Sequence, residues 1–182
     1  MNLIEHLRLM ALNNAWSNRR LLSACAELGD ADFAAGRVSF FPSLQATLNH
    51  ILIVDWYYIE ALEGKGGRGY AIFDNEIPYA TLPPLAQAQA QSDRRLIDFC
   101  AALAERDLTR PVMLDRAARG MMQEQVATVL PHLFAHQIHH RGQAHAMLSG
   151  TSVKPPQLDE FFLFEDRAAT IPELAALGLS RP

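Results

Sequence analysis

The stretch HLFAHQIHHRGQAHAML, residues 132–148, contains five of the seven histidines in this 182-residue chain. On a helix, a turn of about 100° per residue places four of them and Gln143 within one arc of roughly 100°. These four are His132, His136, His139 and His140, whereas His145 points away. Two histidines four residues apart can both reach one cation. The pairs His132/His136 and His136/His140 have this spacing, so the stretch indicates part of a metal site.

A metal site built from this stretch needs a ligand from elsewhere, because two imidazoles are an incomplete set for zinc or nickel. Outside the stretch the chain has only His6 and His50. His50 lies in LQATLNHILIVDW on a face that is otherwise suited to burial, and a buried imidazole without a partner costs about 1–3 kcal/mol. A shared metal would supply that partner. A hydrogen-bonded core histidine and a chance HxxxH pair are the alternatives that spacing alone leaves open.

The apolar spacing along the rest of the chain predicts four long helices and no β-hairpin. Their ranges are about 2–28, 44–62, 84–106 and 122–148, with Pro131 as an expected kink in the last. Loops are expected at 29–43 and 64–83, and VMLDRAARG at 112–120 is either a short strand or an extended crossover. The pattern favours an all-α four-helix bundle.

The length of 182 residues predicts a single domain, 1–182. Its core bundle spans about 2–150, and the C-terminal extension 151–182 carries too many large apolar residues to be free. We expect the extension to pack on the bundle and to contain a short helix at about 171–177.

Composition limits the classes of function. Hydrophobic residues make up 49% and charged residues 20% of the chain, with a formal net charge of -4 and scattered basic residues. This composition is typical of soluble globular proteins and disfavours nucleic-acid binding. No segment resembles a signal peptide or reaches the ~18 apolar residues of a membrane span. Cys25 and Cys100 form no paired motif, which fits reduced thiols, so we expect a cytoplasmic protein with no membrane partner.

Three segments together resemble a known family. HQIHHRGQ at 136–143 resembles the HxxHHRGQ signature of the DinB-like (DinB/YfiT) superfamily, and TLNHIL at 47–52 and NAWSNRRLL at 14–22 extend the resemblance over about residues 2–150. The resemblance implies an up-up-down-down four-helix bundle that binds a divalent transition metal, with zinc or nickel favoured and iron as a further option. The ligands that it implies are His50, His136 and His140. It also makes His139, Arg141 and Gln143 candidates for side chains that orient those ligands, with helix packing as the alternative role of Arg141 and Gln143.

An open site of three imidazoles would lower the pKa of a water or bind a thiolate. The resemblance therefore implies a metal-dependent enzyme, either a hydrolase or a thiol-dependent transferase using a low-molecular-weight thiol, with an unidentified small-molecule substrate. The carboxylates Asp55 and Glu60 flank His50, but Asp55 lies about 140° around the helix from it. Since no general base is evident, the transferase is favoured over the hydrolase.

Two other functions compete with the enzyme. In the first, the protein is a non-catalytic, metal-binding stress-response protein whose metal only joins two helices. In the second, it is a helical dimer without metal. We expect a homodimer, because the aromatic run Trp56, Tyr57 and Tyr58 is predicted to be exposed.

Overall fold

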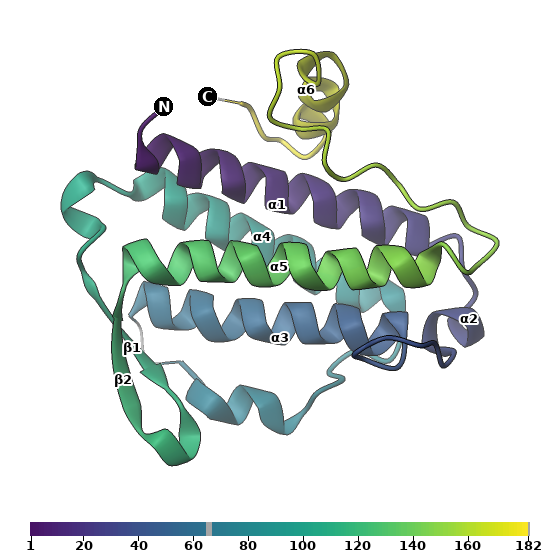
Figure 1. Cartoon of the computed structure of the whole chain (residues 1–182), viewed down its shortest axis with the longest axis horizontal. Helices are drawn as coiled ribbons and strands as arrows, with labels where there is room; N and C mark the ends of the chain where they lie inside the picture. The colour runs from purple at the N-terminus through teal and green to yellow at the C-terminus, as the bar shows by residue number, and fades with distance from the viewer. Residues whose placement is uncertain (65–66, 182) are drawn as a thin grey trace.

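The computed structural model describes residues 1–64 and 67–181, in which four long helices pack side by side (Figure 1). Residues 65–66, within the predicted 64–83 loop, and residue 182 lie outside the described residues. The long helices are α1 (Leu3–Cys25), α3 (Leu44–Glu63), α4 (Leu82–Ala102) and α5 (Val126–Leu148). Each lies on a segment for which the apolar spacing predicts a helix, so the all-α bundle is confirmed.

The helix directions differ from those expected. Helices α1 and α5 run one way and α3 and α4 run the other way (Figure 1), which is an up-down-down-up order rather than up-up-down-down. Contacts agree, since Asp55 of α3 meets Gln89 of α4 and, further along both helices, Glu63 meets Arg95. Apolar spacing determines which face of a helix is buried but not its direction. Here residues 67–81 run back along α3, which lets α4 begin beside the start of α3 (Figure 1).

Helix α3, which carries His50, has well-defined ends. Ser43 caps its first turn by accepting a hydrogen bond from the Ala46 amide at 3.0 Å. Gly64 ends it with a φ of 68°, a left-handed conformation that glycine adopts without steric cost. The local sequence thus determines where α3 starts and stops.

A β-hairpin precedes α5, contrary to the prediction. Strands β1 (Pro111–Asp115) and β2 (Met121–Gln125) pair antiparallel, and α5 therefore begins at Val126 instead of Met122. The segment MMQEQ consists of good helix formers, which is why its sequence suggests helix. Pairing with β1 overrides this propensity, because the buried Val112 and Leu114 anchor β1 in the main apolar cluster.

Shorter helices complete the chain. The C-terminal extension carries α6 (Arg167–Ala176), which starts earlier than the expected 171–177 and packs on α1. The Trp16 indole donates a 2.6 Å hydrogen bond to Glu173, and its ring lies 5.4 Å from that of Phe161. The extension thus covers the bundle, as expected. The remaining elements are α2 (Asp30–Ala34) and η1 (Gly69–Asp74), which lie in the two predicted loops, and η2 (Glu105–Asp107) and η3 (Ala117–Arg119).

The aromatic run on α3 is buried, not exposed. Tyr57 and Tyr58 are only 4% and 5% exposed, and Trp56 is half-buried. The feature from which a homodimer was expected is therefore absent, and the dimer stays a prediction without that support. Among the described helices, none combines the length and apolarity needed to cross a membrane.

Candidate metal centre

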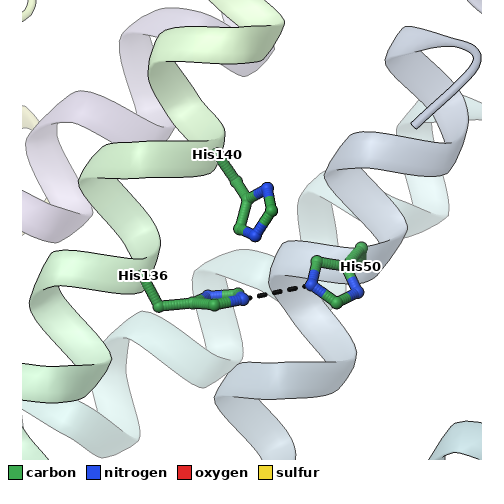
Figure 2. A group of neighbouring side chains, drawn as sticks. All are labelled: His50, His136 and His140. Atoms are coloured by element: carbon green, nitrogen blue, oxygen red, sulfur yellow. Dashed lines mark hydrogen bonds between the residues drawn. The ribbon is translucent and has the colours of Figure 1, made fainter. Parts of the chain in front are cut away.

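Three histidines from two helices meet between α3 and α5. His50 of α3 faces His136 and His140 of α5, and the three rings point toward one another (Figure 2). One potential ligand atom from each lies within 4.8 Å of the others, and the Nε2 atoms of His50 and His136 are 3.1 Å apart. Within residues 1–64 and 67–181, no other group of three histidine, cysteine or acidic side chains meets in this way. The three residues expected as ligands are thus brought together.

Burial keeps these imidazoles neutral. Desolvation, followed by the nearby His140, lowers the pKa of His50 to about 4. Desolvation and then the neighbouring histidines lower the pKa of His136 to about 3. Desolvation also lowers the pKa of His140. At neutral pH the cluster therefore presents uncharged imidazoles, which is the form that binds a metal.

Gln143 fixes the orientation of His140. Its side-chain oxygen lies 2.8 Å from Nδ1 of His140, and its nitrogen lies 3.1 Å from Nε2 of His139. When Nδ1 of His140 donates to the Gln143 oxygen, its Nε2 lone pair is free toward the other two histidines. Such a contact orients a ligating histidine in many metal proteins.

Replacing Gln143 with alanine is expected to lower zinc affinity by about 10- to 100-fold, because His140 loses the acceptor that sets its tautomer. Competition with a chromophoric chelator measures this change. Gln143→Glu keeps an acceptor and should retain affinity near wild type. Equal affinity of Gln143→Ala and wild type would show that Gln143 does not orient the ligand.

The donor set fits a divalent transition metal. Three neutral imidazoles suit zinc, nickel and iron alike. The Nε2 atoms of His50 and His136 approach each other closely. If both atoms carry lone pairs, they repel each other, so the approach is favourable only when a proton or a cation lies between them. Nδ1 of His136 is buried without a hydrogen-bond partner among the described residues, so no hydrogen bond at this atom orients the ring.

The other histidines of the 132–148 stretch lie outside this cluster. His132 is exposed and contacts the Tyr58 ring at 5.2 Å, and His139 is exposed beside Gln143. His145 contacts the carbonyl oxygen of Pro156 at 3.0 Å, away from the cluster. Of the two pairs with HxxxH spacing, His136/His140 therefore belongs to the cluster and His132/His136 does not.

Arg141 lies in the bundle interior and not against the histidine cluster. It is 4% exposed, and its guanidinium donates to the side-chain oxygens of Asn14, Asn18 and Gln137. The nitrogens of these amides donate in turn to the buried carboxylates: Asn14 and Asn18 to Asp93, and Gln137 to Asp55. Each amide therefore turns its oxygen toward the cation and its nitrogen toward an anion. Arg141 braces four helices.

Sequence reasoning missed this buried network, although a signal was present. Its members come from α1, α3, α4 and α5, and three pairs have i, i+4 spacing on otherwise apolar faces. The pairs are Asn14/Asn18, Gln89/Asp93 and Gln137/Arg141. Polar pairs at this spacing on several helices indicate side chains that satisfy one another inside a bundle.

The two carboxylates considered as bases are both engaged elsewhere. Asp55 is fully buried in the network, where burial, followed by the charge of Asp93, raises its pKa to about 7. Glu60 forms an ion pair with Arg68 at 2.7 Å. Neither carboxylate is held against the histidines.

An aromatic hollow adjoins the histidine cluster. Phe41 stacks near His50 with ring centroids 4.2 Å apart and covers one side of the cluster. A hollow of about 490 Å³ opens beside it, within the range of small-molecule sites. Its lining includes His50, His136, Tyr57, Phe73, Glu76 and Arg116. Sequence reasoning did not single out Glu76 or Arg116, because nothing local links them to the histidines.

Comparison with known proteins identifies the family of this chain. The family model described as the DinB family matches residues 3–173. The chain belongs to the DinB family. All three histidines of the cluster, the buried network and most of α6 lie within the matched range.

Two individual relatives illustrate the DinB family likeness. The chain is 26% identical over 144 residues to Protein DinB of Bacillus subtilis (strain 168), covering 74% of this chain and 80% of the relative. It also resembles the crystal structure of a DinB-like protein from Bacillus cereus ATCC 10987, with a TM-score of 0.58 and 16% identity. That match covers 78% of this chain and 90% of the solved one, and it shows the shared fold.

Proposed function

We propose that this DinB family protein is a metal-dependent enzyme of the thiol-transferase type, in which His50, His136 and His140 hold one divalent metal ion. The observation that carries the proposal is the hollow of about 490 Å³ that reaches His50 and His136. A metal that only joins helices usually has four protein ligands. Here no fourth side chain of ligating type joins the three histidines among the described residues.

The bound metal would supply Lewis acidity, which lowers the pKa of a thiol or a water next to it. The chain's own residues set the surroundings of that chemistry. Phe41 excludes water from one side of the cluster, and Gln143 holds His140 in the orientation needed for binding. The only carboxylate along the hollow is the exposed Glu76, so a hydrolase would lack a buried base among the described residues.

Zinc or nickel is the proposed metal, because both bind imidazole firmly, and iron is the next choice. A low-molecular-weight thiol is the proposed co-substrate. A cytoplasmic location is also proposed, since the thiols of Cys25 and Cys100 are free and buried, as in a reducing compartment.

Protein purified without a histidine tag is expected to hold about one equivalent of a transition metal. After exchange to cobalt, adding 2-mercaptoethanol should produce a sulfur-to-cobalt charge-transfer band, because an open site accepts an external thiol. The S-methyl ether of the same compound is the matched control and should leave the spectrum unchanged. If the protein holds metal but its cobalt spectrum does not change when the thiol is added, the purely structural role of the metal is favoured. A protein that holds no metal would refute both the enzyme proposal and the structural role.

A further inference from the structure

Arg116 is a cation at the hollow with most of its donors unused. It is half-buried and lines the hollow together with His50 and His136. Within residues 1–64 and 67–181, its one side-chain hydrogen bond is a long contact of 3.4 Å to the Tyr58 hydroxyl. Among the described residues, no carboxylate lies within ion-pair distance of it. A guanidinium has five N–H donors, so most of its binding capacity is open to a ligand.

The side chain of Arg116 is held in place by its surroundings. Its guanidinium carbon lies 5.9 Å from the centre of the Tyr57 ring and 5.8 Å from that of Tyr58. Cation–π attraction at this distance favours a guanidinium over the two rings. The guanidinium of Arg116 is therefore already positioned beside the Tyr57 and Tyr58 rings when no ligand is bound.

The backbone at Arg116 is pinned to two other elements. The Tyr57 hydroxyl donates to the carbonyl oxygen of Asp115 at 2.6 Å, and the Asp115 carboxylate accepts from the Tyr70 amide at 3.0 Å. Gly69 makes this approach possible, because a Cβ there would lie 2.7 Å from the same carboxylate. These contacts fix the end of the hairpin to α3 and η1. The backbone position of Arg116 is therefore determined by the fold.

The nearby acidic groups do not neutralise Arg116. Glu124 faces a separate hollow beside Arg116, where its carboxylate accepts a hydrogen bond from Thr128 at 3.2 Å. Glu76 is exposed at the rim of the main hollow. The Asp115 carboxylate is occupied by the amides of Tyr70 and Ala117. An incoming anion therefore meets a guanidinium with free donors.

We propose that the hollow binds a small molecule with an aromatic or similarly apolar body and a carboxylate, with Arg116 as the carboxylate-binding residue. The rings of Tyr57, Tyr58 and Phe73 contact the body, while the end of the ligand nearest His50 and His136 lies at the metal site. The inference rests on the proposed function only in treating this hollow as the substrate site. The binding of the carboxylate itself needs no metal.

The test compares two probes of nearly equal shape, 3-phenylpropanoate and 3-phenylpropan-1-ol, by isothermal titration calorimetry on metal-free and zinc-loaded protein. Wild type should bind the carboxylate about 10- to 100-fold more tightly than the alcohol in both forms, as expected for a charge-assisted pair. Arg116→Gln should abolish this preference, and Arg116→Lys should keep part of it. Arg119→Gln, an exposed arginine in the same hairpin, is the matched control and should behave as wild type.

Equal binding of the two probes to wild type, or a preference that survives in Arg116→Gln, overturns the assignment. A preference seen only with zinc and kept in Arg116→Gln would show that the metal binds the carboxylate, which also overturns it. If wild type retains no metal but shows the Arg116-dependent preference, the metal-enzyme proposal fails and the carboxylate site stands. Melting temperatures of the variants confirm that each is folded.

Discussion

Replacing Arg141 with methionine is expected to lower the free energy of unfolding by about 3–5 kcal/mol, the usual cost of removing one partner from a buried set of charges. Methionine is unbranched and fills the space of the aliphatic stem of arginine, so the packing of that stem is kept. The loss arises because Asp55 and Asp93 stay buried without the cation to which the amides connect them. Urea denaturation followed by circular dichroism measures the change.

The loss in free energy of unfolding caused by Arg141→Met should be larger at high pH. Burial raises the pKa of Asp55 to about 7 and that of Asp93 to about 6, whereas Arg141 lowers both. A carboxyl group whose pKa is raised on folding stabilises the protein below its unfolded pKa of about 4 and loses that contribution as pH rises through its folded pKa. Without Arg141 both pKa values rise further. Stability of Arg141→Met should therefore fall more steeply than that of wild type between pH 5 and pH 8.

Two further variants separate charge from packing. Adding Asp93→Asn to Arg141→Met should recover part of the lost stability, because one buried charge is removed with its partner. Arg20→Met removes a partly exposed, bidentate ion pair with Glu173 and a cation–π contact with Trp16, and it should cost about 1–2 kcal/mol, less than Arg141→Met. If the double variant is less stable than Arg141→Met, the loss comes from packing and not from unpaired charge.

Replacing His136 with alanine is expected to reduce zinc affinity by more than about 100-fold, since loss of a direct ligand exceeds the usual effect of losing a residue that only orients one. Metal analysis by mass spectrometry and chelator competition measure this loss. The metal-free variant should melt near the metal-free wild type, because among the described residues His136 loses only its hydrogen-bonding contact with His50, and its Nδ1 has no partner to lose. If His136→Ala retains its metal, the assignment of His136 as a ligand is wrong.

His132→Ala is the matched control for His136→Ala. His132 lies four residues before His136 on the same helix, and His140 lies four residues after it. Both therefore have the spacing that would allow them to share a metal with His136. Its ring contacts Tyr58 and is not part of the cluster. The His132 variant should therefore keep its full metal content, and loss of metal from it would show that the cluster is wider than three residues.

Local sequence located the four long helices, since apolar spacing and end signals such as Ser43 and Gly64 act within a few residues. It failed at MMQEQ, where helix propensity is overridden by pairing with a distant strand. It also failed to give helix direction, which depends on how the connection between α3 and α4 runs. Both failures concern contacts between segments that the local pattern does not describe.

The sequence by itself determined that His136 and His140 lie one turn apart, because i, i+4 spacing on a helix is local geometry. The burial pattern made His50 a candidate partner, the family resemblance implied it as a ligand, and the packing of α3 against α5 brings its Nε2 to 3.1 Å from Nε2 of His136. Only the tertiary structure decided that Arg141 braces the bundle and that Arg116 lines the hollow beside the histidines. Each of those roles depends on side chains far apart in the chain, and which distant side chains meet is decided by the packing of whole elements.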